Sequence, residues 1–204
     1  MSVHRQITAA LLAGGRSSRM GIDKASLQLD GAPVLSSLVT RLWPLCAGGV
    51  MVVRRAEQAL PDLPASCRVE EDLISDCGAL GGLHTALTRA DTPWVFVAAC
   101  DMPLLSPQLV EWMRDQPPQE AQAIIPVRDG FLEPLHAFYS VSCLEPVEHA
   151  LAAGKRRMSS WLGSVRVEQI PEESWQSVHP SGHSFLNVNR PHDLERVAEA
   201  AASR

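Results

Sequence analysis

A glycine-rich segment near the start of the chain has the composition of a phosphate-binding loop. Residues Ala13–Gly21 join a glycine pair to serines, and such small residues let backbone N–H groups approach a ligand closely. Arg16, Arg19 and Lys24 add positive charge, which offsets the repulsion between a triphosphate and an anionic nucleophile. The spacing matches neither the dinucleotide motif G-x-G-x-x-G nor the Walker motif. A flexible turn is the plain alternative for a glycine pair, and the added cations favour phosphate binding.

An aspartate at the end of an apolar run is the candidate metal ligand. Asp101 follows the strand candidate Trp94–Ala99 and precedes Met102–Pro103, so its carboxylate should emerge at the ligand face of a sheet. Magnesium in proteins is held by oxygen ligands, often one or two carboxylates together with substrate phosphates and water. The alternative is an aspartate that caps a turn or the next helix. The sequence therefore predicts that Asp101 is a Mg²⁺ ligand, and capping is the competing structural role.

Apolar runs alternate with helical patterns along the chain. Strands are expected over Ile7–Leu12, Val50–Val53, Arg68–Glu71, Trp94–Ala99, Ala121–Val127, Leu135–Tyr139 and Val165–Ile170. Helices are expected over Leu35–Leu45, Leu80–Ala90, Val141–Ala153 and Pro191–Ala201, and from Pro107 after the N-cap Ser106. This alternation predicts an α/β fold with a parallel or mostly parallel sheet. Ligands bind at the carboxyl ends of the strands in such sheets, so the glycine-rich loop, Asp72 and Asp101 should face one crevice.

The composition is that of an ordinary folded protein and excludes several kinds of partner. The chain is 46% hydrophobic and 20% charged, and we expect one domain over residues 1–204, with loops at Pro117–Gln119 and Pro171–Gly182. A net charge of -5 provides no basic field, so nucleic acid is not an expected partner. The N-terminal apolar run is too short to span a membrane and lacks a signal-peptide pattern. We expect a cytoplasmic protein with reduced thiols and no membrane contact.

A second group of cations lies in the C-terminal half of the chain. Lys155–Arg157 follows Gly154 and precedes the apolar residues Met158 and Trp161. These side chains could bind the phosphate of an acceptor substrate. Solvated charge at the end of a helix is an equally open interpretation.

The motifs described above resemble those of a known enzyme family. Leu12–Lys24 resembles the L-A-G-G-x-S-x-R-M-G-x-x-K signature of the nucleotidyltransferase superfamily that includes NDP-sugar pyrophosphorylases. Further segments, in family order over nearly the whole chain, narrow the resemblance to molybdenum cofactor guanylyltransferases: Glu71–Asp72, Gly78–Gly82, Cys100–Pro103, Lys155–Arg157 and Asn187–Pro191. The resemblance implies a Rossmann-like three-layer α/β/α nucleotide-diphospho-sugar transferase fold with a mostly parallel mixed sheet.

The resemblance also implies roles for individual residues. The nucleotide-binding candidates are Leu12, Ala13, Gly14, Gly15, Lys24, Asp72 and Asp101. The catalytic candidates are Lys24, Asp101 and Arg19, with Arg19 at the phosphates and Asp72 at the base or ribose. Asp101 and Asn189 are the implied Mg²⁺ contacts, although an asparagine before a helix is also suited to capping it. Arg156 and Arg157 are the implied acceptor contacts, and binding of molybdoenzyme maturation proteins is a competing use of these cations.

The expected reaction follows from the same resemblance. The terminal phosphate of molybdopterin, with or without molybdenum, attacks the α-phosphorus of GTP, so that GMP is transferred and pyrophosphate leaves. One departure concerns the base, because the family commonly has an asparagine at the end of the second strand, where this chain has Val52–Arg55. The alternatives are therefore the same chemistry on another base or acceptor, as in molybdopterin cytidylyltransferases or sugar-phosphate nucleotidyltransferases, and a nonenzymatic adaptor that delivers the cofactor.

Overall fold

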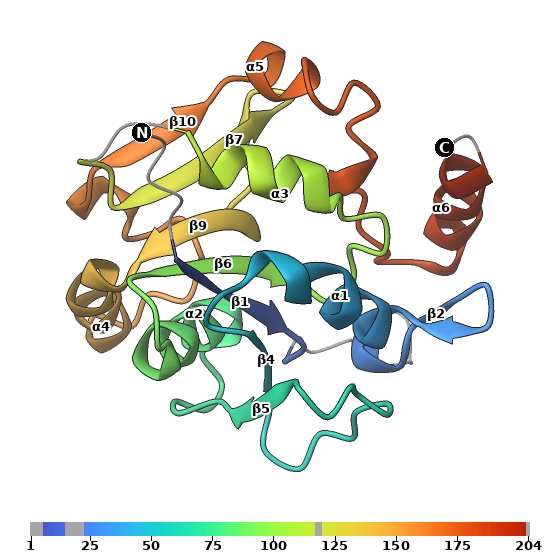
Figure 1. Cartoon of the computed structure of the whole chain (residues 1–204). Helices are drawn as coiled ribbons and strands as arrows, with labels where there is room; N and C mark the ends of the chain where they lie inside the picture. The colour runs from blue at the N-terminus through green and yellow to red at the C-terminus, as the bar shows by residue number, and fades with distance from the viewer. Residues whose placement is uncertain (1–5, 15–22, 117–119, 203–204) are drawn as a thin grey trace.

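A mixed β-sheet forms the middle layer of the fold, which the computed structural model describes over residues 6–14, 23–116 and 120–202 (Figure 1). The order of the strands is β10-β7-β9-β6-β1-β4-β5. Their bounds are β1 Ile7–Leu12, β4 Val50–Arg54, β5 Arg68–Glu71, β6 Trp94–Ala99, β7 Ala123–Arg128, β9 His136–Ser140 and β10 Val167–Ile170. Gly15, Arg16 and Arg19 of the predicted phosphate loop lie outside the described residues.

The directions of the strands bring several carboxyl ends to one edge of the sheet. β5, β4, β1 and β6 are parallel, so the chain leaves all of them on the same side. β9 is antiparallel to β6 and β7, while β10 is parallel to β7. A short strand, β8 (Phe131–Leu132), pairs with β7, and β2 (Gln28–Leu29) pairs with β3 (Ala32–Pro33) in a separate hairpin. The mostly parallel mixed sheet expected from the sequence is confirmed.

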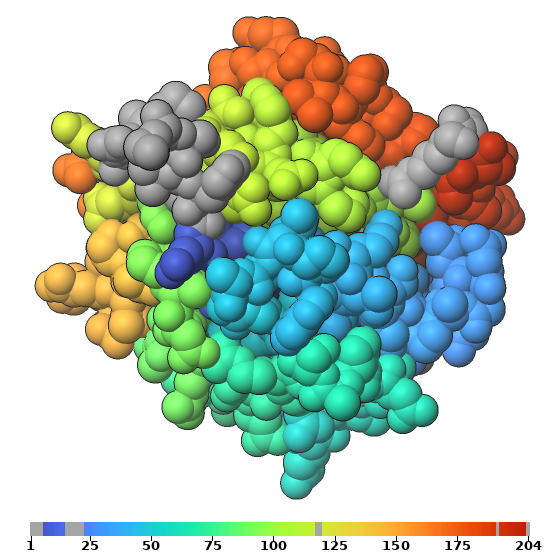
Figure 2. All heavy atoms as spheres, in the orientation of Figure 1, coloured from blue at the N-terminus to red at the C-terminus, as the bar shows by residue number. Residues whose placement is uncertain are grey.

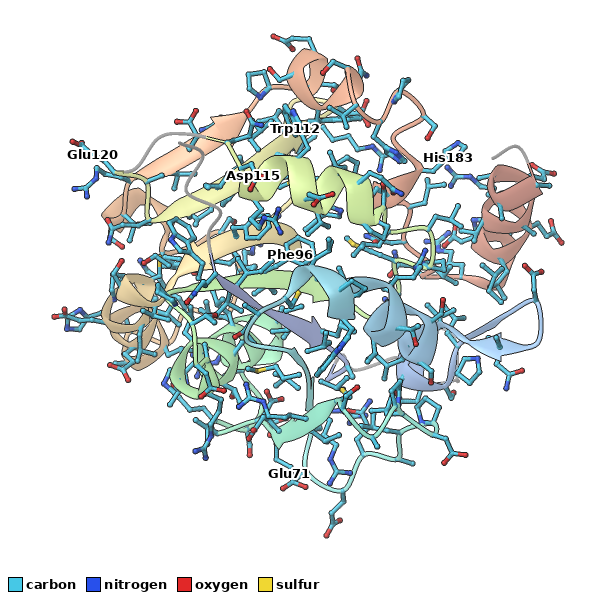
Figure 3. All side chains as sticks on the ribbon, in the orientation of Figure 1. Glu71, Phe96, Trp112, Asp115, Glu120 and His183 are labelled. Carbon is cyan, nitrogen blue, oxygen red and sulfur yellow. The ribbon has the colours of Figure 1, made fainter. Side chains whose placement is uncertain are left out.

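Helices cover both faces of the sheet because successive residues of a strand point to opposite faces. Ala9 and Leu11 of β1 join a core with α1 (Val34–Leu42), α3 (Pro107–Arg114) and α6 (Pro191–Ala202). Ala10 and Leu12 join a second core with α2 (Gly78–Arg89) and α4 (Leu144–Ala152). Figure 2 shows α1 and α3 side by side on the first face. Phe96 of β6 is fully buried, and its label lies near the centre of the view in Figure 3. The fold therefore has the three α/β/α layers that were predicted.

Shorter helices account for most differences from the predicted elements. The predicted helix Leu35–Leu45 ends as the 3₁₀ helix η2 (Trp43–Leu45), where Pro44 has no N–H to continue the α-helical pattern. The other 3₁₀ helices are η1 (Lys24–Ser26), η3 (Val141–Cys143), η4 (Leu162–Ser164) and η5 (His183–Phe185). The loop predicted over Pro171–Gly182 contains α5 (Glu172–Gln176), whose Trp175 is buried and donates a hydrogen bond to Val127 O at 2.8 Å. Within the described part of the chain, no helix has the length and apolar composition needed to cross a membrane.

Gly48, just before β4, occupies a position with no room for a side chain. A Cβ atom there would lie 2.2 Å from Thr8 Oγ1 and 2.7 Å from Thr92 Cγ2. Gly48→Ala should therefore lower the free energy of unfolding by about 1–3 kcal/mol, the usual cost of forcing atoms into a packed interior. Chemical denaturation would measure it, with Gly163→Ala as control, because a Cβ at Gly163 meets nothing within 4 Å. Equal unfolding free energies for the two variants would contradict this account of Gly48.

Candidate functional site

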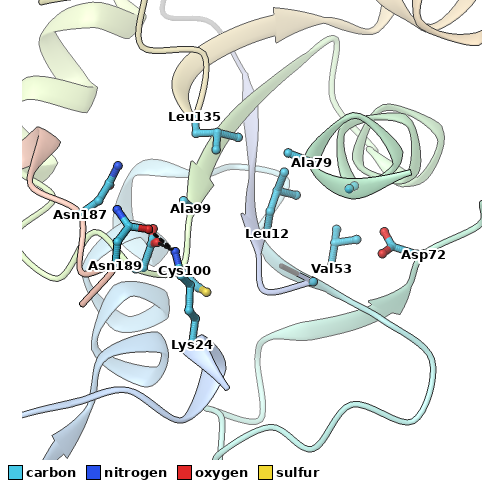
Figure 4. Close-up of a pocket in the computed structure, with 14 residues that line it drawn as sticks. Leu12, Lys24, Val53, Asp72, Ala79, Ala99, Cys100, Leu135, Asn187 and Asn189 are labelled. Atoms are coloured by element: carbon cyan, nitrogen blue, oxygen red, sulfur yellow. Dashed lines mark hydrogen bonds and ion pairs between the residues drawn. The ribbon is translucent and has the colours of Figure 1, made fainter. Parts of the chain in front are cut away.

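A cleft opens at the edge of the sheet where the parallel strands end (Figure 4). Leu12, Val53, Asp72 and Ala99 line it from the ends of β1, β4, β5 and β6, and its volume is about 200 Å³. Figure 4 shows Lys24 and Asn189 on one side of Leu12 and Asp72 on the other. The prediction that the strand ends would bring Asp72 and Asp101 to one crevice is confirmed, because both residues line this cleft.

Lys24, Asp101 and Asn189 form a polar cluster at one end of the cleft. The Lys24 ammonium forms an ion pair with the Asp101 carboxylate and donates a hydrogen bond to Asn189 Oδ1 at 2.6 Å. The Asp101 side chain is 7% exposed, so its charge is shielded from water and depends on such partners. The cluster joins residues that are 77 and 165 positions apart in the sequence.

Local hydrogen bonds hold each member of this cluster in place. Asp23 caps η1 by accepting the Ala25 N–H at 3.0 Å, which fixes the start of the helical turn that carries Lys24. Val188 N–H donates to Asp101 O at 2.9 Å and so ties the segment before α6 to the end of β6. The backbone N–H groups of Asn189 and Arg190 donate to the Asp193 carboxylate. The Asn189 side chain lines the cleft, where its Oδ1 accepts the hydrogen bond from Lys24.

The oxygen atoms of this cluster fit a hard divalent cation. Asp101 Oδ1 is buried and has no hydrogen-bond partner among the described residues, while Asn189 Oδ1 faces the same ammonium as Asp101. A carboxylate and an amide oxygen are ligands that Mg²⁺ accepts, with phosphate oxygens and water completing its coordination. The described residues contain no cluster of three or more His, Cys, Asp or Glu side chains suited to a metal. The site therefore fits a metal that arrives with a phosphate ligand better than an ion held by protein alone.

The thiol beside Asp101 is not suited to nucleophilic chemistry. Cys100 lines the cleft, and burial, followed by the nearby Asp101 charge, raises the pKa of its thiol to about 12. A thiol with so high a pKa is protonated near pH 7, whereas the thiolate is the reactive form. A covalent cysteine intermediate is therefore not supported.

Gly14, Arg55 and Asp72 shape the other end of the cleft. A Cβ atom on Gly14 would lie 3.1 Å from Asp72 Oδ2 and 3.3 Å from Arg55 Cγ, so glycine permits this close approach. A second hollow adjoins the first and shares Gly14, Asp72 and Gly78 with it. Arg55 and Asp76 complete the lining of this second hollow. The two hollows therefore form one elongated cleft, with cationic and acidic side chains at both ends.

The half-buried carboxyl of Asp72 has a raised pKa. Burial raises its pKa to about 6, and the charge of Arg55 acts in the opposite direction. A carboxyl whose pKa is higher in the folded than in the unfolded chain stabilises the fold below its unfolded pKa of about 4. That contribution is lost as pH rises through about 6.

Asp72→Asn should consequently change how stability depends on pH. Between about pH 4 and pH 7, wild type should lose melting temperature relative to Asp72→Asn, because only wild type must ionise this carboxyl in the folded state. Melting curves of the ligand-free proteins across that range measure the difference. Asp91→Asn is the control, since Asp91 is exposed and pairs with Arg68 at 2.7 Å. Parallel curves for wild type and Asp72→Asn would refute the effect.

Several predicted site residues do not line the cleft or lie outside the described residues. Ala13 is buried beneath the cleft, where its N–H donates to Val53 O and its carbonyl accepts a bond from Gln58. Arg156 donates to the carbonyl of Leu151 in the last turn of α4 and to that of its neighbour Lys155. Neither Arg156 nor Arg157 is among the described residues that line the cleft. Nucleotide binding by Ala13 and acceptor binding by the two arginines remain predictions. Gly15 and Arg19 lie outside the described residues.

The family of the chain follows from comparison with known proteins. The model of the MobA-like NTP transferase domain matches residues 9–170. The chain belongs to this family. A relative from Chloroflexus aggregans, named probable molybdenum cofactor guanylyltransferase, is 38% identical over 97% of this chain and 96% of its own. A relative of the same name from Pelotomaculum thermopropionicum is 34% identical over 94% of this chain and 92% of its own.

A solved structure supports the same assignment. The molybdopterin-guanine dinucleotide biosynthesis protein A of Archaeoglobus fulgidus superposes with a TM-score of 0.79 at 26% identity, covering 97% of this chain and all of its own. The resemblance found in the motifs is thereby confirmed, and this MobA-like chain is a nucleotidyltransferase. The matched domain contains Lys24, Asp72 and Asp101, and it ends with β10, before Asn189. Asn189 therefore reaches the cleft from a segment beyond the matched domain.

Proposed function

We propose that the chain transfers GMP from GTP to the terminal phosphate of molybdopterin, with or without molybdenum, and releases pyrophosphate. The cluster of Lys24, Asp101 and Asn189 is the observation that carries this proposal, because it combines a cation for phosphate with oxygen ligands for Mg²⁺. The relatives named molybdenum cofactor guanylyltransferase support the choice of acceptor and base.

The chain would promote this reaction mainly by positioning and charge. An oxygen of the acceptor phosphate forms a bond to the α-phosphorus while the bond to the β-phosphate oxygen breaks, and pyrophosphate carries away the electron pair. The nucleophile is already ionised near pH 7, so a general base is not needed. Lys24 would bind phosphate oxygens and offset their repulsion, while Asp72 would accept hydrogen bonds from the base or ribose.

Asp101 and Asn189 would hold Mg²⁺ beside the phosphates. When bound, Mg²⁺ supplies positive charge that stabilises the phosphate oxygens during transfer. The buried Oδ1 of Asp101 lacks a hydrogen-bond partner among the described residues, and this supports the assignment. The ammonium of Lys24 contacts the same two side chains, so it would give up at least one of these contacts to bind a triphosphate.

The identity of the base is the part of the proposal that most needs a test. Val53 lines the cleft within the segment where the family pattern has an asparagine, and a valine side chain can form no hydrogen bond with a base. Arg55 and Asp76 line the same cleft and would provide a donor and an acceptor there instead. Cytidylyl transfer with the same chemistry is the competing candidate.

A nucleotide panel separates these candidates. Thermal stabilisation by GTP, CTP, ATP and UTP with MgCl₂ reports base preference, because a ligand that binds only the folded chain raises its melting temperature. Pyrophosphate release is then measured with the preferred nucleotide and molybdopterin. GTP preference with release supports guanylyl transfer, CTP preference indicates cytidylyl transfer, and binding without release indicates an adaptor that delivers the cofactor.

A further inference from the structure

A buried glutamine connects the two sides of the glycine-rich segment. Gln58 is 5% exposed, and its Nε2 donates to Ala13 O at 3.0 Å. The same nitrogen donates to the Asp23 carboxylate, at 2.8 Å to Oδ1 and 3.0 Å to Oδ2. Ala13 directly follows β1, and Asp23 directly precedes η1 and Lys24. One amide group therefore contacts both the last residue before the glycine pair and the residue next to the catalytic lysine.

The surroundings of Gln58 determine which way its amide faces. Its Oε1 accepts the Arg55 N–H at 3.1 Å, while its nitrogen faces only acceptor oxygens. A flipped amide would place Oε1 against a carbonyl and a carboxylate and its NH₂ group against another N–H. The observed orientation uses both amide hydrogens and the amide oxygen, as a buried polar group requires.

A tight turn after β4 brings Gln58 back toward β1. Gln58 N–H donates to Arg55 O at 3.2 Å, and Glu57 has a positive φ of 58°, a conformation found in such turns. Arg54 stabilises the turn because its guanidinium donates to Gln58 O at 2.6 Å and to Glu71 Oε1 at 2.7 Å. Arg55 also pairs with Asp23 at 3.3 Å. The segment after β4 therefore holds Asp23 through two separate side chains.

We infer that Gln58 is a positioning residue for Lys24. By holding the Asp23 carboxylate against the end of β1, Gln58 fixes the start of η1, and η1 carries the Lys24 ammonium to Asp101 and Asn189. Its effect on triphosphate binding rests on the function proposed above. Its effect on the Lys24 ammonium does not, because that contact is present without any ligand.

Chemical labelling of lysine tests this role directly. The sequence contains no lysine besides Lys24 and Lys155. Limited acetylation followed by mass spectrometry therefore gives the ratio of Lys24 to Lys155 acetylation, with Lys155 as the internal reference. The Lys155 ammonium is exposed and donates to Ser160 O at 3.2 Å, outside the cleft. Gln58→Leu should raise the acetylation of Lys24 relative to Lys155 severalfold, because the Lys24 amine then spends less time bound to Asp101.

A matched glutamine provides the control for general loss of packing. Gln122 is partly buried, accepts the Arg166 N–H at 3.2 Å and donates to Ser142 Oγ at 3.3 Å, away from the cleft. Gln122→Leu should leave the Lys24 to Lys155 ratio at the wild-type value. Circular dichroism and melting curves confirm that both variants are folded. Should Gln58→Leu fail to fold, Gln58→Glu replaces it, because it keeps the size and the acceptor for Arg55 but places a second carboxylate beside Asp23.

Exchanging the amide and the carboxylate between positions 58 and 23 tests whether their hydrogen bond, rather than the packing of Gln58, positions Lys24. In the double variant Gln58→Glu with Asp23→Asn, the hydrogen bond between these positions can re-form with its direction reversed, and the new amide oxygen can still accept the Ala25 N–H. The Lys24 ratio should return part of the way from the Gln58→Glu value toward wild type. An unchanged ratio in folded Gln58→Leu or Gln58→Glu, or an equal rise in Gln122→Leu, would overturn the inference.

Nucleotide affinity provides the last measurement. If the proposed function holds, Gln58→Leu should raise the dissociation constant of GTP roughly tenfold, the effect expected from about 1.4 kcal/mol of lost interaction. Wild-type protein that binds no nucleotide would refute the proposed function, while the labelling ratio would still decide the role of Gln58. A normal GTP affinity in a variant with a raised labelling ratio would overturn the claim that this positioning serves the triphosphate.

Discussion

Asp101→Asn should lower the rate of nucleotidyl transfer by about a hundredfold or more, as loss of a major electrostatic contact in an active site does. Asparagine keeps the shape of the side chain and removes its negative charge. The buried oxygens of Asp101 would then no longer hold a divalent cation, although Lys24 would remain free to bind phosphate. The loss should therefore fall mainly on kcat, with a smaller change in the KM for nucleotide.

Steady-state pyrophosphate release at several MgCl₂ concentrations measures this effect. Asp91→Asn is a suitable control, because Asp91 is an exposed aspartate paired with Arg68 and does not line the cleft. Near-normal turnover by folded Asp101→Asn that still requires MgCl₂ would remove Asp101 from the mechanism. A rate restored by higher MgCl₂ would instead indicate that the variant binds the cation weakly but uses it normally.

The layers of the fold and the position of the cleft could be predicted because they follow from local patterns. Ile7–Leu12, apart from Thr8, and Trp94–Ala99 are apolar runs without alternation, which is typical of a strand buried on both faces, and both strands have these bounds in the structure. Once neighbouring strands are parallel, their carboxyl ends must share one edge. The neighbourhood of Asp72 and Asp101 follows from this topology, without knowledge of any side-chain contact.

The contacts within the cleft could not be predicted because they depend on tertiary packing. Asn189 is equally suited by its type to capping α6 or to facing the cleft. Only the fold, which brings Lys24 within hydrogen-bond distance of Asn189 Oδ1, decides in favour of the cleft. Gln58 gives no signal in the sequence, since a lone glutamine after a strand is usually exposed and becomes important here through contacts to Ala13 and Asp23.

The acceptor role of the basic run after α4 stays a prediction. Arg156 matched a family segment, and its guanidinium donates to the carbonyl of Leu151 in the last turn of α4 and to that of its neighbour Lys155. Helix C-termini carry unsatisfied carbonyl oxygens, so a nearby arginine finds partners there without any ligand. A run of cations therefore predicts a charged surface more securely than it predicts what that surface binds.

Lys24→Met should reduce both nucleotide affinity and turnover. Among the described residues, Lys24 places its ammonium in the cleft beside Asp101. The attraction of this ammonium for phosphate is needed both for binding and during transfer. A hydrogen bond to a charged group contributes about 1.5–3 kcal/mol, so kcat/KM should fall roughly tenfold to a hundredfold. Arg68→Met serves as the control, because it removes a partly exposed cation that pairs with Asp91 and does not line the cleft.

The same substitution has a second consequence in the ligand-free protein. Methionine would leave the buried Asp101 carboxylate without its ammonium partner, and an unpaired buried charge destabilises a fold. Lys24→Met should therefore melt at a lower temperature than wild type, and MgCl₂ should stabilise it more than wild type, because the cation no longer competes with the ammonium for Asp101 and Asn189. Equal stabilisation of both proteins by MgCl₂ would mean that Lys24 and the metal do not share these oxygens, and a separate metal position would then have to be sought.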